Sequence, residues 1–180
     1  EFENRNRNGQ EFTFFNPPVV LEQKSFDHGT NRNLYWRTGL NYKLSEKSNL
    51  LFNYNMSLAN DRNDTNGSTT SNTIDFENKG ISKSKADNHE FSFQYKTKLD
   101  TLGRTLDVTA YTNLFGRNPL SQSTSFENDN YTYNNGNIDF GLTNYYLKYD
   151  FSFPFEKYGF TLNTGGKYNT TDVKNLGKYN

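Results

Sequence analysis

The chain has 180 residues, with 20 basic and 20 acidic side chains, no cysteine, 32% apolar residues and 17% aromatic residues. The balanced charge disfavours nucleic-acid binding, and the lack of cysteine excludes a disulfide framework or a thiolate metal site. No run approaches eighteen apolar residues, which excludes a transmembrane helix. The mean hydropathy of −1.00 would fit disorder, but thirteen Tyr and sixteen Phe favour strands with one covered face.

The first part of the chain, residues 1–33, has no regular pattern. Pro17 and Pro18 cannot donate to a sheet ladder, so we expect this segment to form the end of a strand and an outer loop. The chain opens at Glu1 without a Met or a signal peptide. We therefore expect it to be a piece of a longer polypeptide.

From residue 34 on, apolar and polar side chains alternate, which is typical of a strand with one covered face. The alternation is interrupted at Ser45-Glu46-Lys47-Ser48, which predicts a tight turn between two strands. The apolar face of this first hairpin consists of Leu34, Trp36, Leu40, Tyr42, Leu44, Leu50, Phe52, Tyr54, Met56 and Leu58.

Residues 59–87 are rich in Asn, Asp, Ser, Thr and Gly and are too polar for a core, which predicts a long loop with a short strand at 74–76. A second hairpin follows, with a turn at 100–104. Its apolar face consists of Phe91, Phe93, Tyr95, Leu99, Leu106, Val108, Ala110 and Leu114. Residues 115–138 predict another long polar loop, which we expect to pair with itself.

The third hairpin has its turn in residues 153–159 and ends the 34–169 region of three hairpins. Its apolar face consists of Tyr145, Leu147, Tyr149, Phe151, Phe160, Leu162 and Tyr168. Residues 170–180 are expected to begin a further loop.

Charge is confined to the other face of these strands. No position on the apolar faces of the three hairpins is charged, although charged residues make up 22% of the chain. The opposite faces hold Arg37, Lys43, Glu90, Lys96, Lys98, Asp107, Lys148, Asp150 and Lys167. A membrane wall requires this exclusion, because Arg or Lys on the lipid face costs roughly 2–4 kcal/mol at the midplane.

These patterns predict an all-β fold, an antiparallel up-and-down meander that forms part of a transmembrane β-barrel. We expect an open or partial barrel with about six long strands plus loop strands. Strands of about eleven residues match the 9–11 that cross a bilayer, and short turns alternate with long loops as in outer-membrane barrels. The alternative is a soluble or surface-attached β-sandwich whose Tyr- and Asn-rich loops bind glycans, because any sheet with one covered face also alternates.

The sequence contains no Gly-x-Ser-x-Gly elbow and no cluster of residues around a histidine, so we expect neither enzymatic activity nor a cofactor or metal site. His28 and His89 lie in polar surroundings and are interpreted as solvated loop residues. The stretch from Asp61 to Gly67 resembles a calcium loop, but its glycine is one place late and Asn72 stands at the position of the bidentate Glu. Gly165-Gly166 is not followed by a helix, so a bend or a close approach of strands is expected.

Three phrases resemble the barrel of the Bacteroidota outer-membrane β-barrel family, which is related to the TonB-dependent receptors: TGLNYKLSEKSNLLFNYNMS, FSFQYKTKLDTLGRTLDVTAYTN and YYLKYDFSFPFEKYGFTLNTGGKYN. The resemblance covers about residues 36–168. It implies a large barrel in the outer membrane of a Gram-negative cell that takes up or binds a small molecule or glycan with energy supplied through TonB. The chain shows no plug domain, TonB-contacting segment or terminal aromatic strand, so transport would belong to a parent protein.

Overall fold

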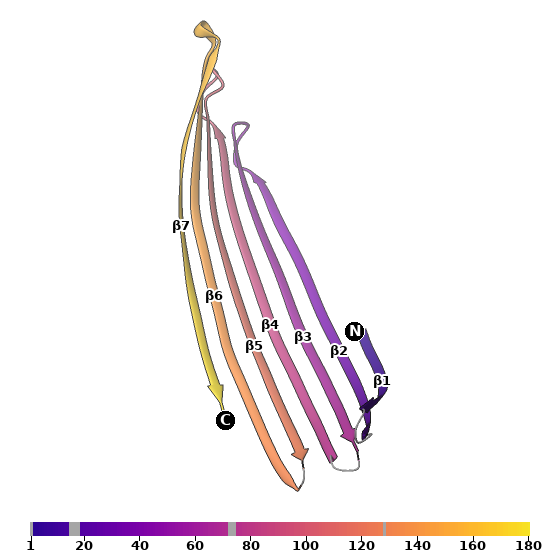
Figure 1. Cartoon of the computed structure of the whole chain (residues 1–180). Helices are drawn as coiled ribbons and strands as arrows, with labels where there is room; N and C mark the ends of the chain where they lie inside the picture. The colour runs from indigo at the N-terminus through magenta and orange to yellow at the C-terminus, as the bar shows by residue number, and fades with distance from the viewer. Residues whose placement is uncertain (1, 15–18, 72–74, 128) are drawn as a thin grey trace.

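The computed structural model shows one antiparallel sheet of seven strands in chain order (Figure 1). The structure describes residues 2–14, 19–71, 75–127 and 129–180. The strands are β1 (Phe2–Phe14), β2 (Val19–Lys43), β3 (Ser48–Thr70), β4 (Asp75–Lys98), β5 (Thr105–Glu127), β6 (Asn130–Phe155) and β7 (Phe160–Tyr179), with one 3-10 turn, η1 (Glu156–Tyr158). Each strand pairs with its neighbours in sequence, which confirms the predicted all-β meander in an open sheet. No helix among these residues is long and apolar enough to cross a membrane.

The strands are much longer than the sequence predicted. Strands β2 to β7 have 20 to 26 residues, which corresponds to roughly 65–85 Å at about 3.3 Å per residue. The predicted loop at 59–87 is wrong, because β3 continues to Thr70 and β4 begins at Asp75. The predicted loop at 115–138 is also strand, although its expected pairing with itself is confirmed by contacts such as Leu120 with Asn137.

The two ends of the chain are also strand where the sequence predicted loops. Residues 2–14 and 19–33 form strand rather than an outer loop, and residues 170–179 belong to β7. Of the short strand predicted at 74–76, Asp75 and Phe76 open β4, whereas Ile74 lies outside the described residues, as do Pro17 and Pro18. These segments are polar on both faces, so hydropathy does not alternate in them, yet their backbone groups continue the ladder of hydrogen bonds.

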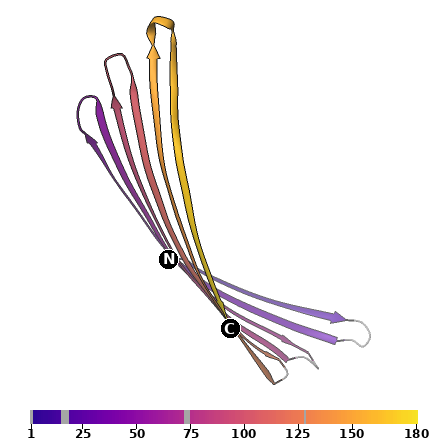
Figure 2. The same cartoon turned by 90° about the vertical axis from the view of Figure 1, so that its left-hand side faces the viewer.

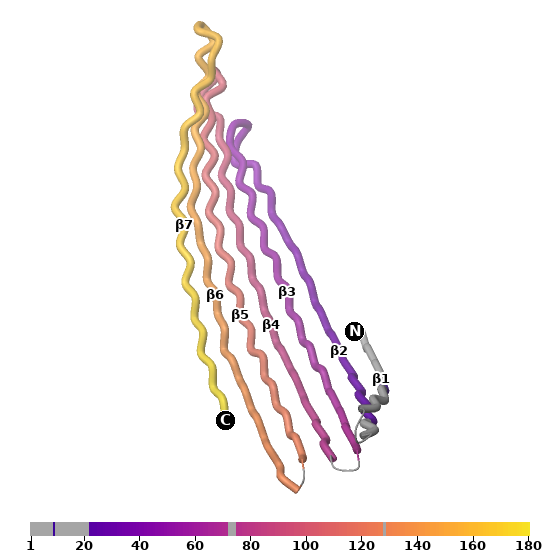
Figure 3. The backbone as a smooth tube through the Cα atoms, viewed as in Figure 1, coloured from indigo at the N-terminus to yellow at the C-terminus, as the bar shows by residue number. Residues whose placement is uncertain are grey.

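The short turns lie together at one end of the sheet and rise in steps from the β2–β3 hairpin to the β6–β7 hairpin (Figure 3). In the first, the Leu44 N–H donates to the Ser48 carbonyl over 3.0 Å. In the second, the Asp100 carboxylate accepts the N–H groups of Leu102 at 2.9 Å and Arg104 at 3.2 Å. The third turn consists of η1 and ends at Gly159, whose φ of 67° is in the left-handed region. The turn was predicted at 153–159, but β6 continues to Phe155, so the turn is shorter than predicted.

The described residues form a single layer, and none of those with described burial contributes to an apolar core. Among the residues whose burial is described, Ser84 is the only buried one, at 8% exposure. The accessible surface is 13262 Å², whereas a compact monomer of 20.9 kDa would expose roughly 9,000 Å². Figure 2 shows the strands bending midway, with both chain ends at the bend. A sandwich requires two packed sheets, and the described residues form only one, so the sandwich alternative is wrong for this chain.

Candidate membrane-facing surface

Apolar side chains from six strands gather on one face of the sheet. Through the strand register, Leu40, Phe52, Phe93, Ala110, Leu147 and Tyr168 form one continuous row. We call the whole set the apolar belt. It consists of Leu34, Trp36, Leu40, Tyr42, Leu50, Phe52, Tyr54, Met56, Leu58, Phe91, Phe93, Tyr95, Leu106, Val108, Ala110, Leu114, Tyr145, Leu147, Tyr149, Phe151, Phe153, Phe155, Phe160, Leu162 and Tyr168. The face predicted from the alternation is therefore confirmed.

The belt is exposed and uncharged. Leu40 is 62% exposed, Leu147 50% and Tyr168 68%. The remaining positions of this face within the belt are occupied by Thr38, Ser48, His89, Thr97, Thr112, Thr164 and Gly166, and the charged Asp87 stands opposite Leu58 just outside the border. A charge-free stripe across six strands is far larger than the apolar patches that water-soluble monomers expose.

The belt crosses the sheet obliquely. It ends at Leu34 on β2, but the residue level with Leu34 on β7 is the charged Lys174. On β7 the belt ends at Tyr168, which is level with Leu40. This drift of about six residues over about five interstrand steps corresponds to a strand tilt of roughly 40°, within the 35–45° of outer-membrane barrels.

Aromatic rings gather at both borders of the belt. On the side away from the short turns, Tyr54 lies 4.7 Å from Phe91 and 6.0 Å from Trp36, measured between ring centroids. On the side of the short turns, Phe151 stacks on Phe153 at 5.8 Å, and Phe155 stacks on Phe160 at 4.8 Å. Aromatic girdles at both interfaces are typical of membrane barrels.

His89 lies at one of these borders rather than in a loop, which corrects the sequence interpretation. It is part of β4, and its Nδ1 lies 2.8 Å from the hydroxyl of Tyr54, whose ring it stacks on. His28 is likewise a strand residue, in β2. Both were placed in loops because the polar halves of the strands carry no alternation.

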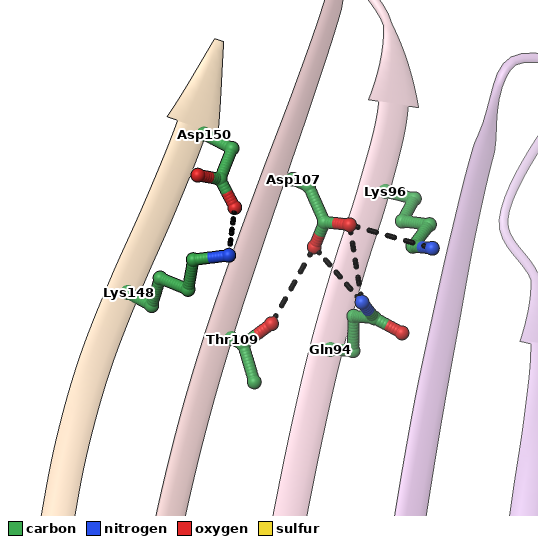
Figure 4. A network of polar contacts seen from close by, with 6 residues as sticks. All are labelled: Gln94, Lys96, Asp107, Thr109, Lys148 and Asp150. Carbon is green, nitrogen blue, oxygen red and sulfur yellow. Dashed lines mark hydrogen bonds and ion pairs between the residues drawn. The ribbon is translucent and has the colours of Figure 1, made fainter. Parts of the chain in front are cut away.

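Alongside the belt, the charged side chains lie on the other face of the sheet, as predicted. Figure 4 shows Asp107 of β5 accepting two hydrogen bonds from the Gln94 amide, at 3.0 and 3.1 Å, and lying 3.4 Å from the Lys96 ammonium. Asp150 of β6 lies directly opposite Asp107 in the register and pairs with Lys148 over 2.7 Å. Two carboxylates opposite each other repel, and the two lysines offset that repulsion.

A second polar network lies further along the same face. Glu90 accepts hydrogen bonds from the amides of Asn55 at 3.1 Å and of Asn88 and Asn113 at 3.4 Å. These side chains are half-buried at most and hold one another in place. Such a face suits a water-filled space.

The same face also carries an aromatic pair. The rings of Tyr111 and Tyr146 stack at 5.0 Å, and the Lys167 ammonium lies 4.4 Å from the Tyr146 ring centre. Together with the polar networks, this pair shows that four of the charged side chains predicted for this face contact a neighbouring strand, namely Glu90, Lys96, Asp107 and Lys167.

The two other motifs of the sequence are placed as follows. The stretch from Asp61 to Gly67 is part of β3, so Asp61 and Asp64 lie on opposite faces, and Asp64 pairs with Arg62 at 3.0 Å. No group of three or more potential metal-ligating His, Cys, Asp or Glu side chains occurs among the described residues. At Gly165-Gly166 the close approach is confirmed, because a Cβ on Gly166 would lie 2.9 Å from the Tyr149 ring.

Sequence reasoning missed one cluster, the basic side chains Arg32, Arg62, Lys83 and Lys85. They belong to segments interpreted as loops, and only the strand register brings them onto the face of the belt. No local pattern in the sequence could have placed them together.

The comparisons with known proteins leave the family open. No family model matches the chain, and no curated protein matches it. Similar solved structures include the membrane pore complex of pneumolysin (6% identity, 97% of this chain and 31% of that chain, TM-score 0.18). Others are the beta domain of the Bordetella autotransporter Brka (9% identity, 98% and 96%, TM-score 0.14) and a loop-deletion mutant of OmpT, an outer membrane protein of Vibrio cholerae (8% identity, 99% and 98%, TM-score 0.16). These TM-scores are far below 0.5, so the similarities establish no role for this chain.

Proposed function

We propose that this chain is a segment of the wall of an outer-membrane β-barrel. The apolar belt contacts lipid, and the face with Glu90, Asp107 and Asp150 lines the lumen. Two features of the sheet carry this proposal together. The sheet has a single layer, and none of the side chains with described burial is both apolar and buried. One of its faces is free of charge over the nine to eleven residues that a strand needs to cross a bilayer.

The energetics favour lipid over water on the belt. Each square ångström of apolar surface left in water costs about 25 cal/mol, and this chain offers no second layer to cover it. A bilayer covers the belt and leaves the backbone satisfied within the ladder, which is the condition for a spanning sheet. The polar networks on the opposite face then remain in water.

We propose further that the short turns face the periplasm and that the long polar ends of the strands project outside the cell, because outer-membrane barrels have short periplasmic turns. From the resemblance of the three hairpins, we propose that the parent barrel serves nutrient uptake or ligand binding at the cell surface. Its partners would be TonB, through parts outside this chain, and a small molecule or glycan. The chain itself is proposed to have no enzymatic activity.

The native fluorescence of Trp36 tests the wall proposal, because it is the only tryptophan and lies at one border of the belt. The chain is folded into phosphatidylcholine vesicles that carry bromine at defined depths of the acyl chain. We expect bromine near the headgroup to quench Trp36 more than bromine at the bilayer centre, and acrylamide in the water to quench it weakly.

Two variants serve as matched controls. In W36F with Phe93→Trp, the probe sits in the middle of the belt, and the deepest bromines should quench it most. In W36F with Tyr35→Trp, the probe sits on the opposite face, and acrylamide should quench it while lipid bromines do not. Trp36 emission that responds to acrylamide alone would overturn the proposal.

A further inference from the structure

Four basic side chains from three strands meet on the outward face just beyond the apolar belt. Arg62 of β3 is directly opposite Lys83 of β4, and Asn60, two residues before Arg62, lies between Arg32 of β2 and Lys85 of β4. All four basic side chains are exposed. We call Arg32, Arg62, Lys83 and Lys85 the basic patch.

The basic patch borders a hollow and the belt at once. The hollow has a volume of about 340 Å³ and is lined by all four basic residues together with Thr30, Asn60, Ser84 and one acidic residue, Asp61, which accepts a hydrogen bond from Asn31. Leu34 and Leu58, which are paired in the register, are the belt residues next to Arg32 and Asn60 on this face. A headgroup held in the hollow therefore contacts polar and cationic groups and lies beside the apolar surface that begins at Leu34 and Leu58.

The patch keeps a net positive charge after its local ion pairs are counted. Arg62 pairs with Asp64 at 3.0 Å, and the nearby Asp87 lies 3.9 Å from the His89 ring nitrogen. No ion pair among the described residues involves Lys83 or Lys85. Two ammonium groups in a partly hollow site are therefore available to an anion.

The opposite border of the belt has no such excess. The three short turns hold equal numbers of acidic and basic residues, namely Glu46, Lys47, Asp100, Arg104, Glu156 and Lys157. Arg104 and Asp100 pair with each other at 3.4 Å. The positive charge is thus concentrated at one border and on strands β2 to β4.

We propose that the basic patch binds the phosphate-bearing headgroup of an anionic lipid whose acyl chains lie along the apolar belt. This inference rests on the proposed wall function and adds the lipid class that the wall selects. The chemistry fits, because a guanidinium binds phosphate oxygens through two parallel hydrogen bonds, and lysine ammonium groups near a membrane surface attract anionic lipid.

Bromine quenching of Trp36 also measures this preference, because Trp36 lies on the same face of β2 as Arg32. The chain is folded into phosphatidylcholine vesicles that contain an equal fraction of either brominated phosphatidylglycerol or brominated phosphatidylcholine. We expect phosphatidylglycerol to occupy the site near Trp36 with an affinity about tenfold above phosphatidylcholine. In K83Q/K85Q the two lipids should quench almost equally.

The control variant K43Q/K98Q removes the same charge from the opposite face and should keep the tenfold preference. Equal quenching by both lipids in the unaltered chain would overturn the lipid site while leaving the wall proposal intact. Failure of every variant to insert, with Trp36 accessible to acrylamide alone, would instead overturn the wall. Loss of the preference in 10 mM inorganic phosphate, but not in sodium chloride of equal ionic strength, would show a site for soluble phosphate and contradict the lipid assignment.

Discussion

Adjacent residues of one strand lie on opposite faces of this sheet, which in the proposed barrel wall contact lipid on one side and the lumen on the other. Val108 lies in the belt between Tyr95 and Tyr149, whereas Thr109 lies on the polar face between Gln94 and Lys148. An arginine at the two positions would meet lipid in one case and the carboxylates of the polar face in the other. The strand register therefore predicts different effects of arginine at two neighbouring positions.

We predict that V108R lowers the folded fraction in phosphatidylcholine vesicles strongly, because Arg on the lipid face near the midplane costs roughly 2–4 kcal/mol. T109R should fold almost as well as the unaltered chain, because Asp107 lies two residues away on the same face. Circular dichroism and protease resistance of the vesicle-bound chain measure the folded fraction. Equal yields for the two variants would show that the faces are assigned wrongly.

At the level of the strand, the polar halves are the unexpected part of the molecule. Residues 59–70 and 75–87 pair with each other along their whole length, for example Asn63 with Ser82, although their composition predicted a loop. Strand β3 also has β2 on its other side, so its backbone groups have partners on both edges. A residue with two ladder neighbours does not need an apolar face to remain extended.

Amide hydrogen exchange tests this point. We predict that amides of residues 60–68 exchange on the order of a hundredfold more slowly than those of the turn residues Ser45 and Glu46, because opening the polar half breaks ladders on both sides. The same measurement on residues 160–168 of β7, which has one neighbouring strand among the described residues, gives the exchange rate of an edge strand for comparison. Exchange of residues 60–68 as fast as in the turn would restore the loop interpretation.

On the scale of the whole molecule, the sheet is open along both edges. Strand β1 pairs with β2 only up to Asn31, so residues 32–43 of β2 have no described neighbour on that side. Strand β7 forms the other edge. Unpaired edges next to an exposed apolar belt are templates for association with other chains.

We predict that the 180-residue chain aggregates when it is produced without detergent and gives a discrete species when it is folded in detergent micelles. Light scattering and size-exclusion chromatography in both conditions provide the measurement. A monodisperse monomer in plain buffer that unfolds cooperatively would mean that the belt is covered from within the chain.

The sequence by itself determined the two faces, the belt and the positions of the three short turns. Alternation places Leu40 and Phe52 on one face through the geometry of a single strand, and turn residues such as Asp100 act within a few positions. These features need no knowledge of distant partners.

Only the tertiary structure decided how far each strand continues and which polar residues become neighbours. Arg62 and Lys83 are brought together by the β3–β4 register, and Asp107 faces Asp150 through the β5–β6 register. Where both faces of a strand are polar, hydropathy contains no period, and the backbone ladder that keeps the strand extended depends on hydrogen bonds between segments far apart in the chain. The basic patch was invisible in the sequence for that physical reason.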